Sequence, residues 1–350
     1  MDEFASEVTL TPRKQRRART RDDVRNWPAL IAAEEPLYRR AFQSAGARRV
    51  AVFSTGDGHR ARLFARWGMS VLCVVEDPAD VKRLQAAYEE DRARTGGRTG
   101  DMRIVSGGIE DLPRLVGAER VEAIVCVDDL VTRVDGFGTL RENLQALAES
   151  LMAGGVLILA TRNYPRMTYR RERMEEPLVA EDATGTRLFT RVVTYDPNGV
   201  HVHIEDLIVE KPTYAFEDEP DEPEAETDPA PESELETDAT PDTSDETTES
   251  IVGEKDGELE ELDPDPDAGE DATEEMPPLN ITGDWRVTSK REMHVSASPD
   301  VLKNELVHTG FDVIEVAGSH DGKRFALMED DMLVIVSRRK KPRTTVHLDR

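Results

Sequence analysis

The segment from Arg48 to Asp77 constrains the fold more than any other part of the sequence. It begins with a short apolar run, Val50–Phe53, passes through a glycine-containing turn, and enters a helical pattern over His59–Trp67. A second apolar run, Val71–Val75, follows and ends on two acidic residues. A strand, a glycine turn, a helix and a second strand followed by an acid form the layout of a nucleotide-binding βαβ unit. Glycines permit the tight turn, and the helix N-terminus offers free N–H groups, so the segment predicts a site for an adenosine-like ligand.

The same alternation of apolar strands and amphipathic helices extends to about residue 160. Further strands are expected at 102–105, 121–127 and 156–160, and helices at 26–45, 78–92 and 140–151, where Gly154 and Gly155 end the last helix. Strands that are apolar on both faces and alternate with amphipathic helices are typical of an α/β fold with a doubly wound, mostly parallel sheet.

The pattern changes after Asn163. Two strands, Arg187–Tyr195 and Val200–Val209, flank a hairpin turn, and a third strand is expected at Trp285–Val295. We interpret these three as a small antiparallel lid. A helix capped by Ser298 and two closing strands, at 311–316 and 332–336, should then rejoin the main sheet as an antiparallel hairpin and bring it to seven strands.

The charge of the chain is concentrated in one segment. The net charge is −27, but Glu217–Glu275 holds 28 acidic residues and a single base, Lys255, and the rest of the chain has 44 acidic and 44 basic residues. Its polar, proline-rich composition predicts a disordered insertion between the second and third lid strands. Two roles stay open: a solubilising spacer, or an electrostatic decoy for a basic partner or for the chain's own basic tails. Nucleic acid is not favoured as a partner of those tails, because no aromatic residues interleave with their arginines.

These features divide the chain into six parts. They are a flexible basic tail (1–25), a Rossmann-like core (26–163), the first lid strands (164–214), the acidic insertion (215–280), the third lid strand with the final helix and closing strands (281–338), and a second basic tail (339–350).

Three further observations concern compartment and metals. Cys73 and Cys126 stand alone in apolar strands, which indicates a reducing, cytoplasmic setting. No apolar run is long enough to span a bilayer, so no membrane association is expected. His201, His203 and His294 lie on neighbouring lid strands, but their spacing does not favour a metal site, and none is predicted.

The order of these motifs resembles that of the class I S-adenosylmethionine-dependent methyltransferases, over residues 37–163 and 285–338. The glycine motif of that family lines up with Val52–Gly58, its ribose-binding acid with Glu76, its adenine segment with Ser106–Pro113, and its glycine pair with Gly154 and Gly155. The resemblance implies S-adenosylmethionine as cofactor. The cofactor-binding residues that it implies are Ser54, Thr55, Gly56, Asp57, Gly58, Glu76, Asp77, Gly108, Ile109 and Val127.

The resemblance also implies methyl transfer to a small-molecule acceptor by in-line displacement. Acceptor-side residues are expected where the fourth and fifth strands end, because ligands bind at the carboxyl edge of such sheets. The candidates there are Asp128, Arg162, Asn163 and Tyr164. Methyl transfer depends mainly on positioning, so the sequence names no catalytic residue.

Departures from the family pattern keep two alternatives open. Val52 stands in place of the leading acid of the glycine motif, Ser54 in place of its first glycine, and Gly108 in place of the adenine-segment Asp. A non-catalytic binding or scaffold protein with the same fold would explain these losses. An NAD-dependent enzyme is the other alternative, because Gly56-x-Gly58-x-x-Ala61 with Glu76 fits a dinucleotide fingerprint.

Overall fold

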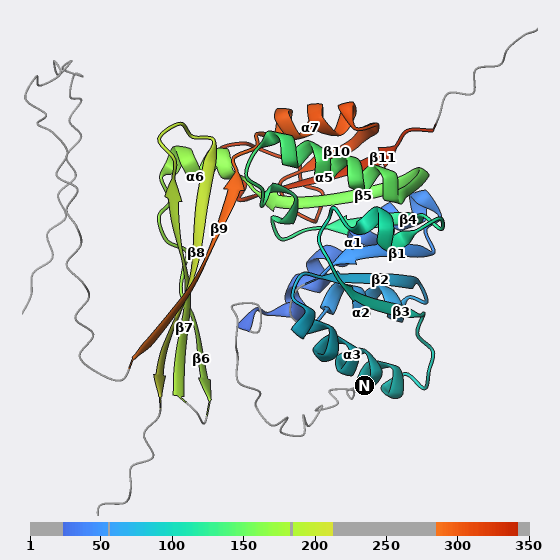
Figure 1. Cartoon of the computed structure of the whole chain (residues 1–350), viewed down its shortest axis with the longest axis horizontal. Coiled ribbons are helices and arrows are strands. Elements are labelled where there is room, and N and C mark those ends of the chain that lie inside the picture. The colour runs from blue at the N-terminus through green and yellow to red at the C-terminus, as the bar shows by residue number, and fades with distance from the viewer. Residues whose placement is uncertain (1–23, 55–56, 183–184, 213–284, 342–350) are drawn as a thin grey trace, which may run out of the picture. The chain divides into compact units, whose positions relative to one another are not determined.

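A computed structural model of the chain describes residues 24–54, 57–182, 185–212 and 285–341. These residues form two sheets and the helices around them (Figure 1). The strands of sheet A are β1 (Arg49–Phe53), β2 (Ser70–Val75), β3 (Met102–Ser106), β4 (Val121–Cys126), β5 (Leu151–Arg162), β10 (Phe311–Ala317) and β11 (Met332–Arg339). Those of sheet B are β6 (Leu178–Asp182), β7 (Gly185–Tyr195), β8 (His201–Pro212) and β9 (Arg286–Val295). The helices are α1 (Trp27–Ala45), α2 (His59–Arg66), α3 (Pro78–Arg94), α4 (Leu112–Val116), the 3-10 turn η2 (Leu130–Thr132), α5 (Phe137–Ser150), α6 (Tyr164–Arg170) and α7 (Pro299–His308).

Sheet A has the order β10-β11-β5-β4-β1-β2-β3. The strands β1 to β5 pair in parallel, and β11 pairs antiparallel with both β5 and β10. The predicted α/β class, the seven-stranded sheet and its antiparallel closing hairpin are therefore confirmed.

Both faces of sheet A are covered by helices, because its strands are apolar on both sides. On one face α1, α2 and α3 pack on side chains such as Val52, Cys73 and Val125. On the other face α4, α5 and α7 pack on the alternate side chains, such as Ala51 and Ile124. The two cores hold the carboxyl ends of the parallel strands along one edge of the sheet.

The order of the strands reverses between β1 and β4. The chain runs from β1 to β2 and β3 on one side, and then crosses back so that β4 pairs with β1 on the other side. Doubly wound sheets bind ligands outside the carboxyl ends of the strands at such a reversal. The residues that follow β1 and β4 are therefore the first place to look for a site.

Several helix starts follow the sequence rules. Asn26 caps α1 by accepting a hydrogen bond from the Ala29 N–H at 3.2 Å. Ser298 caps α7 by accepting one from the Val301 N–H at 3.3 Å. In both helices a proline follows within the first two positions, where a missing N–H costs nothing.

The glycine pair before β5 behaves differently from its prediction. The helix α5 already ends at Ser150, and β5 begins at Leu151, so Gly154 and Gly155 lie inside the strand. The pairing with β4 skips from Leu151 opposite Val121 to Val156 opposite Ala123. Gly154, with φ of 85°, occupies the resulting bulge, a conformation that glycine adopts without strain. The pair therefore bends a strand and does not end a helix.

Sheet B is the predicted antiparallel layer with one more strand than expected. β7, β8 and β9 match the three predicted strands, and residues 196–199 turn between β7 and β8. The additional strand is β6, which pairs with β7. It was missed because Leu178–Asp182 is short and ends on two acids, so it has little of the apolar alternation that marks a strand.

The acidic insertion and most of both basic tails lie outside the described residues. The two ends of the insertion attach to β8 and β9, which pair directly, Glu210 opposite Arg286. Among the described residues, no helix is long and apolar enough to cross a membrane.

Candidate active site at the carboxyl edge of sheet A

The turn after β1 is built around Gly58. Thr55 and Gly56 lie outside the described residues. Ser54 continues the strand pairing, donating its N–H to the carbonyl of Val74 at 2.9 Å, and the Asp57 carboxylate lies 3.5 Å from Arg83. Gly58 has φ of 63°, and a Cβ there would lie 2.7 Å from the Leu84 side chain. Because Gly58 has no side chain, it also leaves the first N–H groups of α2 uncapped, which suits a polar ligand group.

The two acids after β2 have different surroundings. Asp77 accepts a hydrogen bond from the Ala79 N–H at 2.8 Å and so caps α3. The side chain of Glu76 is 48% exposed, and its carboxylate contacts the guanidinium of Arg133. Of the two predicted ribose acids, Glu76 is thus the one whose carboxylate is not occupied by the backbone.

The predicted adenine segment turns tightly after β3. The Gly108 N–H donates to the Asp111 carboxylate at 3.2 Å, and a Cβ on Gly108 would lie 2.3 Å from the Glu110 carboxylate. Ile109 and, after β4, Val127 are buried to 3% exposure in the two cores. These two apolar residues therefore belong to the cores beneath the carboxyl edge and offer no polar side-chain contact.

An ion-pair network fills the reversal point between β1 and β4. Arg60, in the first turn of α2, donates two hydrogen bonds of 2.7 Å to Glu34 of α1 and one of 2.6 Å to Asp128. Arg25 contacts the other oxygen of Asp128 at 3.3 Å, and Tyr38 donates to Glu34 at 2.9 Å. Arg60 and Glu34 are almost completely buried, so their charges neutralise each other away from water, whereas the side chains of Arg25 and Asp128 are 24% and 25% exposed.

Electrostatics at Asp128 follow from this network. Burial raises the pKa of its carboxyl, but Arg60 and Arg25 outweigh burial and lower the pKa to about 2. Asp128 and Asp129 both have positive φ, 58° and 64°, in a turn that places their carboxylates on different partners. Neither carboxylate caps a helix.

Asp129 organises the end of β5. Its carboxylate accepts hydrogen bonds from the Arg162 backbone N–H and from the Thr161 hydroxyl, the latter at 3.0 Å. The Arg162 guanidinium lies 3.6 Å from Asp129 and 2.9 Å from Glu175. Arg162 therefore reaches from the edge of sheet A to the segment that leads into sheet B.

Asn163 and Tyr164 are held by structural contacts. Asn163 caps α6 and donates to the carbonyls of Leu327 and Asp330 at 2.6 and 2.9 Å. Tyr164 is fully buried in a small apolar cluster with Met167 of α6 and with side chains of β7 and β8. The structure thus brings Arg162 to the site but directs both neighbours into packing.

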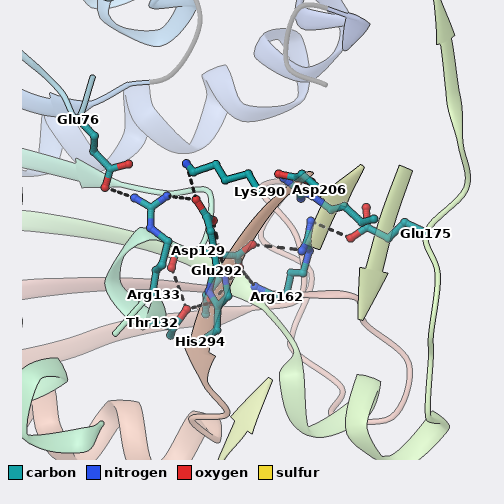
Figure 2. Close-up of polar contacts among 12 residues, drawn as sticks. Glu76, Asp129, Thr132, Arg133, Arg162, Glu175, Asp206, Lys290, Glu292 and His294 are labelled. Atoms are coloured by element: carbon teal, nitrogen blue, oxygen red, sulfur yellow. Dashed lines mark hydrogen bonds and ion pairs between the residues drawn. The ribbon is translucent and has the colours of Figure 1, made fainter. Parts of the chain in front are cut away.

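Arg133, which follows η2, joins the two sheets (Figure 2). It contacts Glu76 at the end of β2 and donates a hydrogen bond of 2.9 Å to Glu292 of β9. Lys290 approaches Glu292 at 2.7 Å. The ribose-acid candidate is thereby linked through one arginine to a carboxylate on sheet B.

The three lid histidines do not converge. His201 and His203 both contact the Asp196 carboxylate at 2.9 Å, at the hairpin turn of sheet B. His294 lies near Glu292, with 3.8 Å between Nε2 and the carboxylate, and its ring lies 5.4 Å from that of Tyr164. No cluster of three or more metal-ligating side chains is present among the described residues.

The sequence did not predict Arg133, Glu292 and the pair Glu34–Arg60 as residues of the site. Their partners are 26 to 159 residues away along the chain, so no local spacing marks them.

Comparison with known proteins identifies the fold. No protein-family model and no curated protein matches the sequence. Among solved structures, the methyltransferase CcbJ from Streptomyces caelestis is similar, with a TM-score of 0.56 and 15% identity over 89% of this chain and 90% of that one. A S-adenosylmethionine-dependent methyltransferase from Clostridium acetobutylicum has a TM-score of 0.54 and 9% identity over 88% and 91%.

This chain has the fold of the class I methyltransferases. A third similar structure is the sugar N-methyltransferase KedS8 from Streptoalloteichus, with a TM-score of 0.52 and 14% identity over 89% of this chain and 88% of that one. The methyltransferase fold accounts for the strand order, its reversal point and the closing hairpin described above.

Proposed function

We propose that the protein transfers a methyl group from S-adenosylmethionine to a small-molecule acceptor. The observation that carries the proposal is the turn at the reversal point, where Gly58 opens α2 in a left-handed conformation and an exposed carboxylate, Glu76, ends the neighbouring strand. A glycine turn, an uncapped helix start and a ribose-facing acid are the elements that an adenosine ligand needs.

The residues present fit this cofactor at several points. The turn Ser54–Gly58 would lie against the amino-acid end, Glu76 would accept hydrogen bonds from the ribose hydroxyls, and Gly108, Ile109 and Val127 would contact the adenine ring. Asp77 would contribute through α3, which it caps. When bound, the cofactor supplies a methyl group on a positively charged sulfur, an activated donor.

The acceptor would approach from the side of β4, β5 and sheet B. Among the predicted acceptor residues, Arg162 and Asp128 carry charged groups at the edge of sheet A, and we propose that they orient the acceptor for in-line displacement. Asn163 and Tyr164 would act indirectly, by holding α6 beneath Arg162. The name of KedS8 fits a small amine acceptor, although that likeness is one of fold.

A non-catalytic binding protein is the second candidate. Val52, which stands where the family has an acid, is completely buried, and Arg133 already contacts Glu76. Each absent polar anchor would cost about 1–3 kcal/mol of binding free energy. The NAD alternative is weaker, because the antiparallel β10–β11 pair takes the place of a second mononucleotide-binding half.

Isothermal titration of the full chain with S-adenosylmethionine, S-adenosylhomocysteine and NAD tests the proposal. We expect the first two to bind and NAD not to bind. Glu76→Gln should weaken their binding about tenfold, the loss of one charged hydrogen-bond acceptor. The matched control is Glu119→Gln, at a side chain that is 86% exposed at the opposite end of β4.

The outcomes separate the candidates. Binding of NAD alone would make the protein a dinucleotide enzyme, and binding of none of the three would favour the non-catalytic alternative. Equal effects of the two substitutions would contradict the role of Glu76.

The proposal also covers the cellular location of the protein and the partner of its acidic insertion. Two buried free thiols, Cys73 and Cys126, support a reducing, cytoplasmic location. A basic partner for the acidic insertion, or the chain's own basic tails, remains a proposal that rests on composition alone.

A further inference from the structure

His294 is a buried imidazole without a hydrogen-bond partner. It lies next to the last residue of β9 and is 2% exposed, yet neither ring nitrogen has a partner within hydrogen-bond distance among the described residues. Its nearest acidic group, the Glu292 carboxylate, is 3.8 Å from Nε2, an ion-pair distance that is too long for a hydrogen bond. Buried polar groups are nearly always paired, so an unpaired imidazole indicates a function.

The position of His294 connects it with the proposed cofactor site. Glu292 receives a hydrogen bond from Arg133, and Arg133 also contacts Glu76, the proposed ribose acid (Figure 2). On its other side, the ring of His294 lies against Tyr164, which follows β5. His294 thus lies next to Tyr164, which follows β5, and next to Glu292, the partner of Arg133.

The carboxylate beside this ring is ionised. Burial raises the pKa of the Glu292 carboxyl, but His294, Lys290 and Arg133 together hold it well below its usual range. Glu292 is therefore ionised at neutral pH. An ionised carboxylate beside a buried imidazole stabilises the imidazolium that forms when the ring takes up a proton.

We propose that His294 accepts the proton that an amine acceptor loses when it is methylated, with Glu292 stabilising the resulting imidazolium. The inference rests on the proposed methyl transfer and adds the class of acceptor and its base. The ammonium N–H bond breaks as the proton passes to a ring nitrogen of His294. The freed nitrogen lone pair then bonds to the methyl carbon, while the methyl–sulfur bond breaks and its electron pair stays on the sulfur.

An amine fits this base better than an alcohol. An alkyl ammonium resembles a lysine side chain, with a pKa of about 10.4, and a histidine has a usual pKa of about 6.5. The difference between these two pKa values is small enough for a nearby carboxylate to reduce. An alcohol hydroxyl is a far weaker acid, and neutral imidazole is a poor base for it.

The charged groups around His294 come from four elements. Glu292 and Lys290 lie on β9 itself, Arg133 follows η2, Asp129 follows β4, and Arg162 ends β5. The ring partner Tyr164 stays neutral, because burial raises its pKa far above the usual value. His59, at the start of α2, also stays neutral at working pH, because burial and Arg62 lower its pKa to about 4.

The test compares the binding of two cofactor analogues as a function of pH. Sinefungin carries an amine at the position of the transferred methyl group, and S-adenosylhomocysteine has a bare thioether there. Dissociation constants for both are measured by titration of the full chain between pH 5.5 and pH 7.5. A protonated imidazole repels the sinefungin ammonium and a neutral imidazole accepts its hydrogen bond, so the proposed role predicts a preference for sinefungin that rises with pH, by about tenfold across this range.

Three variants make the result specific. His294→Gln should abolish the rise, and His308→Gln, on the exposed end of α7, should leave it unchanged. Glu292→Gln should move the midpoint of the rise to lower pH, because the imidazolium loses its carboxylate. If His294→Gln does not fold, the midpoint in Glu292→Gln decides the question.

A failure of the proposed methyl transfer can be distinguished from a failure of the role of His294. If the wild-type chain binds neither analogue, the proposed function is overturned and this inference with it. If both bind with a constant preference, or if His294→Gln retains the rise, the role of His294 alone is overturned. An unchanged midpoint in Glu292→Gln likewise contradicts it.

Discussion

In sheet A nearly every side chain of β1 and β4 is buried, whereas in sheet B buried and half-buried positions are interspersed along β7, and most of β9 is exposed. Helices cover sheet A on both faces, whereas the small apolar cluster at sheet B joins three buried residues of β7 and β8 to two of α6. Farther along its strands, ion pairs join directly opposite residues, Arg187 with Glu210 and Arg191 with Asp206.

One chain thus stabilises its two sheets by different means. Apolar burial involves no charge that salt can screen or pH can titrate, whereas a partly exposed ion pair such as Arg191–Asp206 depends on both. The buried network at the reversal point is the exception within sheet A, because there the stability depends on charges that are shielded from water.

The largest effect is expected from disrupting the buried ion-pair network at the reversal point. Arg60→Ala leaves Glu34 buried without its partner, so the free energy of unfolding should fall by about 3–5 kcal/mol in urea denaturation. The control is Arg94→Ala, which removes an exposed pair with Glu90 and should cost less than about 1 kcal/mol. Similar losses in the two variants would show that the buried network is not a special source of stability.

The next effect separates the apolar core around α5 from the small apolar cluster of sheet B. Leu144→Ala, in the fully buried face of α5, should lower the global free energy of unfolding by about 2–5 kcal/mol. Ile204→Ala, in the small cluster of sheet B, should instead speed amide hydrogen exchange in β7–β9 and leave β1 and β4 protected. Val287→Ala, at a half-exposed position of β9, is the control for both. Faster exchange in β1 and β4 after Ile204→Ala would mean that the sheets unfold as one unit.

An acid titration should give an intermediate effect. The folded pKa of Asp128 is about 2, below its unfolded value, so its stabilisation is present above about pH 4 and is lost as the pH falls toward 2. The shift corresponds to about 2 kcal/mol, and Asp128→Asn should lack this part of the acid-induced loss. Denaturation curves between pH 6 and pH 2.5 measure it.

The matched position for that titration is in sheet B. The pKa of Asp196 is also lowered, by hydrogen bonds to His203 and His201 at the hairpin turn, whereas Asp128 faces the buried Arg60 guanidinium. Asp196→Asn should therefore change the acid response less than Asp128→Asn. The reverse ranking would contradict the importance of the buried Arg60 guanidinium for Asp128.

The smallest effect concerns a cross-strand pair of sheet B. Asp206→Asn should cost about 0.2–1 kcal/mol at low salt, as expected for a partly exposed pair between directly opposite residues. In about 0.5 M NaCl this loss should shrink, because the Debye length falls to a few ångströms, whereas the effect of Arg60→Ala should persist. A salt-independent loss at Asp206 would indicate packing and not charge.

Much of the fold followed from short-range patterns. The strands of sheet A are apolar and β-branched, the helices between them have clear apolar faces, and Asn26 and Ser298 cap helices where their side chains predict it. The patterns failed for β6, which lacks alternation, and for Gly154, because a glycine indicates a positive φ but not whether it lies in a turn or a bulge.

The site was predictable only in outline. The glycine turn and the acid after β2 come from contiguous segments, so their spacing is visible in the sequence. The choice of Glu76 over Asp77 depends on which carboxylate caps α3, and the burial of Tyr164 depends on where sheet B packs. These are contacts between distant segments.

The amino-acid sequence by itself determined the α/β class, the order of strands and helices, and the glycine turn, because these depend on periodicity and on the conformational range of single residues. Only the tertiary structure decided which charges are buried and paired. Arg60 with Glu34, Arg133 with Glu76 and Glu292, and the unpaired ring of His294 each depend on segments far apart in the sequence. The energy of a charge or an imidazole depends on its surroundings in space, and those surroundings exist only after the chain has folded.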